Sequence, residues 1–189
     1  MSKELKDIQS ILLKNSTTIA KTSTEKFVPG VQKVYGIRMP LLNELAVKFK
    51  EGGFELAEEL WRSGAYEEKV LAAKLLGKIA KKDPVQALKL VDLFSKNIEN
   101  WAICDAVGMQ SLKPIVRTHQ KEIFLLAKKL NVSKDPWQRR LSLVIVEWHT
   151  RMHELHPEIE KLIATVENDD EYYVQKAIVW IRKNFKKGK

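Results

Sequence analysis

The stretch ENWAICDAVG, residues 99–108, places an aromatic ring and a carboxylate one helical turn apart. Residues four apart in a helix share a face, so Trp101 and Asp105 are expected to project side by side. A carboxylate can stabilise developing positive charge, or orient and deprotonate water, and an indole face attracts cations. The pair therefore suits a reaction that passes through a cation. The alternative is a packing role, with Asp105 at a helix-end contact or an exposed rim.

Length and composition indicate which kind of protein carries this pair. The chain has 189 residues, of which 44% are hydrophobic and 30% charged, as in one soluble globular domain. No apolar run approaches the roughly 18 residues that span a bilayer, and MSKELKDIQS lacks the apolar core of a signal peptide. Cys104 is the only cysteine, which excludes disulfide frameworks and cysteine-rich zinc sites. We expect a cytoplasmic monomer whose single domain spans residues 1–189.

Charge is unevenly distributed along the chain. The net charge is +9, yet residues 154–171 carry seven acids against one base, and residues 176–189 carry six bases and no acid. A basic tail is expected at about 182–189. It is either a frayed, solubilising end or a segment that attracts phosphates, since releasing condensed counterions favours binding to nucleic acid.

Apolar residues recur at three- and four-residue steps along most of the chain, which predicts an all-α protein of about ten helices. Asp-Pro and His-Pro pairs separate the segments, because proline cannot continue a helix interior. The main predicted segments are residues 41–50, 54–63, 66–82, 84–96, 122–130, 137–151, 157–167 and 172–185.

A repeat emerges from the aromatic residues that begin four of these helices. They are spaced 35, 36 and 36 residues apart: Tyr66, Trp101, Trp137 and Tyr173. Three positions further on, basic residues occupy three copies of four: Lys69, Cys104, Arg140 and Lys176. This period predicts an α-α superhelix, a solenoid of HEAT-like antiparallel helix pairs in which each pair covers the next.

Two positions break the repeat. Four residues after the aromatic, three copies are apolar and one is an acid: Val70, Asp105, Leu141 and Ala177. Seven residues after it, three copies are small or medium and one is the largest side chain: Ala73, Gly108, Val144 and Trp180. Isolated exceptions are where function is expected to override packing, although Trp180 can also simply fill core.

These residues carry a family resemblance. The chain resembles the AlkD-type DNA alkylation repair glycosylases, which are built from HEAT-like repeats, between about Tyr35 and Phe185. The matching segments, in the family's order, are YGIRMPLLNELAVKF, LWRSGAYEEKVLAAKLL, NWAICDAV, PWQRRLSLV and YYVQKAIVWIRKNF. The resemblance implies hydrolytic excision of cationic alkylated purines, such as 3-methyladenine and 7-methylguanine, from duplex DNA without a cofactor.

The resemblance also assigns roles to individual residues. Asp105 matches the family's catalytic aspartate, and Trp101 and Trp180 match its two cleft tryptophans. These three side chains are expected to converge on a concave, basic groove with a backbone-gripping arginine, Arg140, at its rim. The residues expected to bind the DNA backbone are Arg139, Arg140, Lys176, Arg182 and Lys183.

Other interpretations compete with this one. The scaffold can instead be a catalytically weak or inactive module that binds DNA or a protein. His149 and His153 stand four apart, as a helical metal pair does, but the residues between them lack the glutamate of a zinc hydrolase. We therefore expect exposed histidines and no metal. Glu147 is a candidate second acid, with an exposed helix position as the preferred interpretation, and Cys104 is expected to be a small buried residue.

Overall fold

The computed structural model describes residues 1–186, and every regular element in that range is helical. The last three residues of the predicted basic tail lie outside the described residues. The α-helices are α1 (Lys3–Lys14), α2 (Thr18–Phe27), α3 (Met39–Lys48), α4 (Gly53–Ser63), α5 (Tyr66–Ile79), α6 (Pro84–Ser95), α7 (Trp101–Ala106), α8 (Gln120–Asn131), α9 (Pro136–Val144), α10 (His156–Thr165) and α11 (Tyr172–Phe185). None of them combines the length and apolar character that a bilayer-spanning helix requires.

Side-chain caps and prolines set the helix starts. The side chain of Asn100 accepts the N–H of Ile103 at 3.0 Å and begins α7, and Asp135 accepts the N–H of Trp137 at 2.8 Å and begins α9. Each cap satisfies a backbone donor that the first turn leaves unpaired. Pro136 occupies the first position of α9, where its missing N–H costs nothing. Trp101 is therefore the first residue of α7, and Trp137 is the second residue of α9.

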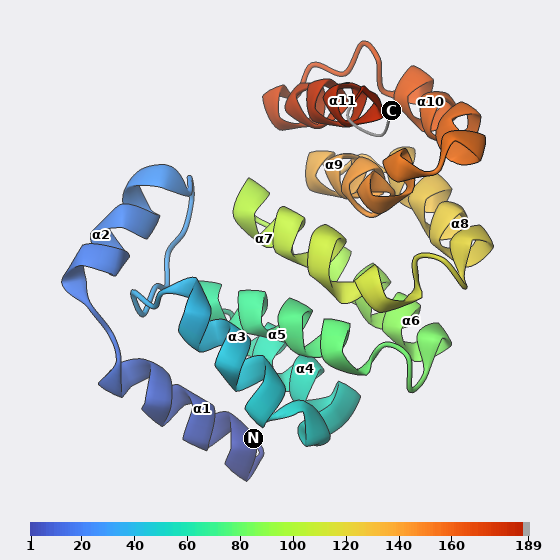
Figure 1. Cartoon of the computed structure of the whole chain (residues 1–189). Coiled ribbons are helices and arrows are strands. Elements are labelled where there is room, and N and C mark those ends of the chain that lie inside the picture. Colours follow the sequence, from blue (N-terminus) through green and yellow to red (C-terminus); the bar gives the residue numbers. More distant parts are fainter. Residues whose placement is uncertain (187–189) are drawn as a thin grey trace.

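The helices form two layers, which confirms the predicted all-α, solenoid-like fold. The inner layer runs α3, α5, α7, α9, α11, and the outer layer runs α4, α6, α8, α10. Figure 1 shows α5, α7, α9 and α11 following one another up the molecule, with α6, α8 and α10 along its right-hand side. One continuous apolar cluster fills the space between the layers. Each helix pair thus buries its neighbour's apolar face, as the repeat predicts.

Close approach of the inner helices requires small residues. After α7 the chain continues as a π-helical turn, Val107–Ser111. A Cβ atom on Gly108 would lie 2.5 Å from Cγ1 of Val144, and one on Gly77 would lie 2.4 Å from the carbonyl oxygen of Gln110. Trp180 occupies the position equivalent to Gly108 on α11 and is half-buried there.

The helix predicted over residues 137–151 is shorter than expected. It ends at Val144, and residues Glu147–Arg151 form a 3₁₀ helix, so the predicted exposed positions turn inward. Glu147 is buried, pairs with Arg151 at 3.1 Å and accepts a hydrogen bond from Asn184 on α11 at 2.8 Å. It is therefore a structural acid, and the expectation of an exposed position is wrong.

His149 lies in the same 3₁₀ helix and also turns toward the core. Its ring is buried, and Nε2 lies 2.8 Å from the carbonyl oxygen of Val116. Burial lowers the pKa of His149, which favours a neutral imidazole. The expectation of an exposed His149 is wrong, whereas His153 is exposed and the predicted burial of Cys104 is confirmed.

A buried glutamate holds the segment between α2 and α3. The Glu67 carboxylate is fully buried and accepts the backbone N–H groups of Tyr35, Gly36 and Ile37 at 2.9, 2.7 and 3.1 Å. These bonds satisfy three donors in a stretch with no regular structure of its own. They also fix the entry to α3, whose first residue, Met39, reaches the groove described below.

Replacing Glu67 should destabilise the protein. Glu67→Ala leaves three buried donors unpaired, so we expect the free energy of unfolding to fall by about 3 kcal/mol in urea denaturation. Glu44→Ala on the exposed side of α3 is the matched control, with an expected change within about 0.5 kcal/mol. Equal effects of the two substitutions would show that Glu67 does not hold this segment.

Candidate active site

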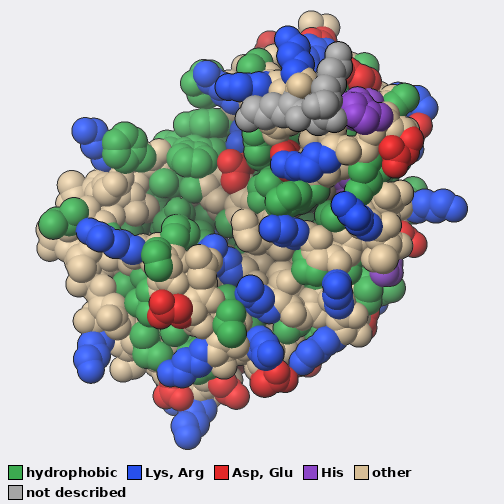
Figure 2. All heavy atoms as spheres, viewed as in Figure 1, with side chains coloured by type: hydrophobic (Ala, Val, Ile, Leu, Met, Phe, Trp, Pro, Cys, Tyr) green, Lys and Arg blue, Asp and Glu red, His purple; other side chains and the backbone are tan. Residues whose placement is uncertain are grey.

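The inner layer carries an open groove of about 410 Å³ that contains Trp101 and Asp105. Side chains from the start of α3, along α5 and α7, and from the π-helical turn after α7 line it: Met39, Tyr66, Val70, Lys74, Trp101, Ala102, Asp105, Ala106, Met109 and Gln110. Figure 2 shows that this face is hollowed between α2 and α7 and that hydrophobic side chains gather in the hollow. The predicted pairing of an indole and a carboxylate on one face of α7 is therefore present.

Trp101 is fixed at the first turn of α7. Its ring is half-buried against the core, and Nε1 donates a hydrogen bond to the carbonyl oxygen of Phe27 at 3.3 Å. Phe27 is the last residue of α2, a helix with no buried residue of its own. The indole therefore links α2 to the inner layer and has a defined position beside Asp105.

Asp105 is partly buried and bound on one side. Its side chain is 29% exposed, and Oδ1 accepts a hydrogen bond from Nη2 of Arg140 at 2.8 Å. Burial raises the pKa of Asp105, while the charge and hydrogen bond of Arg140 oppose that rise. In the described part of the chain the second oxygen, Oδ2, has no hydrogen-bond partner. The carboxylate is thus oriented through one oxygen and available through the other.

Arg140 lies inside the protein, so its expected position at the groove rim is wrong. Its side chain is 6% exposed. Nη1 donates to the carbonyl oxygen of Tyr173 on α11 at 2.6 Å, while Nη2 holds Asp105 on α7. Nε is buried without a partner. The guanidinium therefore connects the two inner helices on either side of α9, and its visible role is to position Asp105.

The same repeat position has a similar role on α5. Lys69 is buried, and its Nζ lies 3.0 Å from both the carbonyl oxygen of Asn97 and the carboxylate of Glu99, just before α7. Lys69 and Arg140 therefore both reach the beginning of the next inner helix. Two of the three repeated basic residues therefore connect successive repeats, whereas the third, Lys176, is exposed.

Aromatic rings line the groove beside the Asp105 carboxylate, but only one of the two predicted cleft tryptophans is among them. Tyr66, which sequence reasoning treated only as a repeat marker, lines the groove with Trp101. Trp137 and Tyr173 pack against each other with ring centroids 5.2 Å apart. Trp180 is half-buried on α11 and is not among the residues that line the groove. Its assignment as a second cleft tryptophan stays a prediction.

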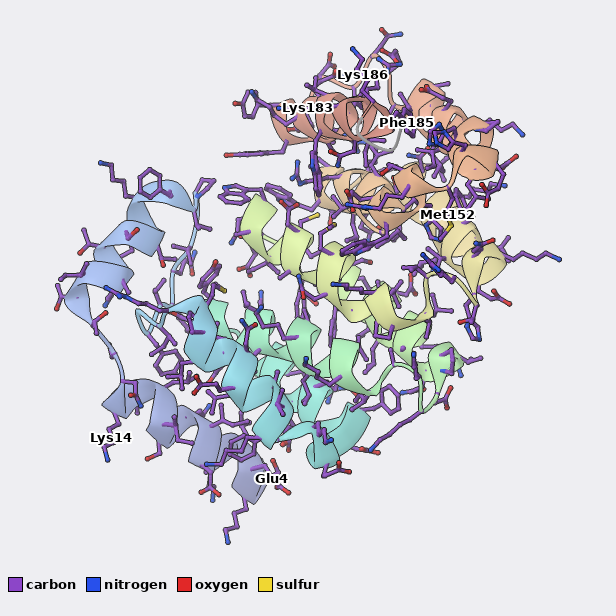
Figure 3. The ribbon with its side chains drawn as sticks, viewed as in Figure 1. Glu4, Lys14, Met152, Lys183, Phe185 and Lys186 are labelled. Atoms are coloured by element: carbon purple, nitrogen blue, oxygen red, sulfur yellow. The ribbon has the colours of Figure 1, made fainter. Side chains whose placement is uncertain are left out.

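Two of the predicted DNA-binding arginines are paired with acids. Arg139 binds Asp169, with Nη2 3.1 Å from Oδ1, and Arg182 binds Glu167, with Nη1 2.8 Å from Oε1. These carboxylates come from the acidic segment at residues 154–171; the pair of Arg139 is largely buried, whereas that of Arg182 lies at the surface. Lys176 and Lys183 are exposed on α11, and Figure 3 places Lys183 in the upper part of the molecule.

A comparison with protein families identifies the chain. A family model described as "DNA alkylation repair enzyme" matches residues 8–187, a range that includes every inner helix together with Trp101, Asp105 and Arg140. No individual curated protein matches. Because the match covers nearly the whole sequence, the chain belongs to the DNA alkylation repair enzyme family.

Proposed function

We propose that this protein is a DNA N-glycosylase that hydrolyses the N-glycosidic bond of cationic alkylated purines, such as 3-methyladenine and 7-methylguanine, in duplex DNA. Membership of the DNA alkylation repair enzyme family supports a repair reaction. The observation that carries the proposal is the Asp105 carboxylate, which lies in the groove beside Trp101 with one oxygen held by Arg140.

The proposed chemistry needs one carboxylate and no general acid. When the bond between C1′ of the deoxyribose and the base nitrogen breaks, its electron pair neutralises the positive charge of the base. The sugar then becomes cationic, and the Asp105 carboxylate stabilises that charge. Water forms the new bond to C1′, and Asp105 accepts its proton. The products are the free neutral base and an abasic site.

Aromatic faces complete the proposed site. Trp101 and Tyr66 line the groove with Asp105, and each face attracts a cationic sugar or base by about 0.5 to 2 kcal/mol. Burial raises the pKa of Tyr66 to about 12, so its hydroxyl stays protonated and the ring remains neutral. Trp180 is retained in this proposal as a further aromatic contact on α11.

Arg140 acts in this scheme as a positioning residue. Its hydrogen bond fixes Oδ1 of Asp105, which leaves Oδ2 to face the reacting sugar and water. Its charge also favours the ionised carboxylate at a partly buried position, where desolvation favours the neutral acid. Arg140 therefore supports the reaction through Asp105 and not through direct contact with the substrate.

Removal of the carboxylate should abolish most base release. Asp105→Asn keeps the shape of the side chain but cannot stabilise the cation, so we expect release of 7-methylguanine from methylated duplex DNA to fall at least about 100-fold. Single-turnover release of free base is the measurement. Equal release by the two proteins would contradict the assignment, and DNA binding without release by the wild type would favour the non-catalytic module.

Removal of the Arg140 charge should shift the acid limb of the pH–rate profile. The reaction needs ionised Asp105, so the rate falls as pH drops through its pKa. Without Arg140 nothing opposes the effect of burial, and Arg140→Met should move the acid limb to higher pH, with partial return in Arg140→Lys.

The matched control is Arg139→Met, because Arg139 pairs with Asp169 and not with Asp105. Its acid limb should coincide with that of the wild type. If Arg140→Met instead lowers the rate by one factor at every pH, Arg140 does not act through the ionisation of Asp105.

A further inference from the structure

A second groove adjoins the candidate active site on the inner layer. It has a volume of about 140 Å³ and is lined by Asn43, Ala46, Lys74, Gly77, Lys78, Gln110, Lys113 and Pro114. Lys74 and Gln110 also line the groove that contains Asp105. The same inner elements therefore provide both grooves, the aromatic and acidic part at their beginnings and this basic part at their ends.

The second groove concentrates positive charge. Lys74, Lys78 and Lys113 line it, and no carboxylate does among the residues that the structure describes. Nζ of Lys74 donates to Oδ1 of Asn43 at 2.7 Å, so its position is defined. Burial and the charge of Lys78 lower the pKa of Lys74. An anion placed between these ammonium groups would relieve their mutual repulsion.

Several other cations of this protein have acidic partners. Lys82 pairs with Glu51, and Lys129 pairs with Asp92, as Arg139 and Arg182 pair with the acids named above. The three lysines of the second groove form no ion pair in the described structure. Figure 2 shows Lys and Arg side chains gathered on the face formed by α5 and the segment after α7. Their charge is therefore available to a ligand.

The repeat arranges two of these lysines as equivalents. Lys78 lies twelve residues after Tyr66, and Lys113 lies twelve residues after Trp101. Both line the same groove, Lys78 from the end of α5 and Lys113 from the 3₁₀ helix Lys113–Ile115. Lys113 is also steadied by Trp148, because its Nζ lies 4.4 Å from the ring centroid and the indole N–H is bonded to the carbonyl oxygen of Met109 at 3.0 Å.

We infer that Lys74, Lys78 and Lys113 bind backbone phosphates of the DNA strand whose damaged nucleotide lies over Asp105. This inference rests on the proposed function for its choice of ligand. The three lysines lie beside the groove that contains Asp105. They are therefore placed to bind a polyanion, such as a DNA strand, that extends beyond the nucleotide over Asp105. Contacts of this kind fix the position of a duplex without reading its sequence. They would add to the contacts predicted for Arg139, Lys176, Arg182 and Lys183, whereas Arg140 is buried.

Salt dependence of binding tests this inference. The variant Lys78→Gln/Lys113→Gln removes two charges from the groove, and Lys89→Gln/Lys121→Gln removes two exposed charges from the outer helices α6 and α8. Dissociation constants for undamaged duplex DNA are measured by fluorescence anisotropy at several salt concentrations. We expect the groove variant to reduce the slope of log affinity against log salt by about 2, and the control to reduce it by less than half as much.

Three outcomes would overturn the inference. One is an equal slope for the groove and control variants while circular dichroism shows both folded. Another is an unchanged slope in Lys78→Gln alone, which avoids any effect on the packing of Trp148. The third is a site for free phosphate only, in which inorganic phosphate binds to the wild type and the groove substitutions leave the affinity for DNA unchanged. Because binding is measured on undamaged DNA, a wild type that releases no base would defeat the proposed function alone.

Discussion

The ion pair between Asp105 and Arg140 is the interaction on which the geometry of the groove depends. Taking two charges out of water is costly, and the attraction between them offsets that cost only when hydrogen bonds satisfy the remaining donors. Arg140 meets part of this requirement by bonding to the carbonyl oxygen of Tyr173 as well as to Asp105. One side chain on α9 thereby fixes the Asp105 carboxylate of α7 relative to α11. The contact is possible because Gly108 brings the element that follows Asp105 directly against Val144.

The solenoid explains how a simple repeat can carry a specific site. The inner helices α5, α7, α9 and α11 each carry an aromatic ring within their first two residues and pack against their neighbours through the same positions. One substitution in one repeat therefore changes the surface without changing the scaffold. Asp105 is such a substitution, because the equivalent positions hold Val70, Leu141 and Ala177, all buried apolar residues. The acid replaces an apolar contact where the groove opens to solvent. Farther along the same elements, Lys78 and Lys113 form a basic surface at matching positions.

Sequence reasoning predicted much of the fold and part of the site. Apolar periodicity located the inner helices α3, α5, α9 and α11, and the repeat register located the start of α7 and singled out Asp105, because both depend on local spacing. It did not identify the partners of the arginines. Spacing placed Arg139 and Arg140 correctly on α9, but only the tertiary structure brings Asp169 and Asp105 to them.

The periodic pattern also continued through residue 151, whereas the backbone changes to a 3₁₀ helix after Val146, which rotates Glu147 and His149 into the core. Trp180 was singled out as an exception to the repeat, and in the structure it is half-buried on α11 and does not line the groove.

The central claim is that the Asp105 carboxylate stabilises a cationic sugar in this groove, and a charged mimic of that sugar tests it most directly. Two duplexes are compared, one with a protonated pyrrolidine in place of a single deoxyribose and one with a neutral tetrahydrofuran ring at the same position. An enzyme that stabilises the cationic transition state binds its charged analogue more tightly. The wild type should therefore prefer the pyrrolidine duplex by at least about tenfold, or about 1.4 kcal/mol, and Asp105→Asn should lose that preference. An equal preference in both proteins would contradict the account.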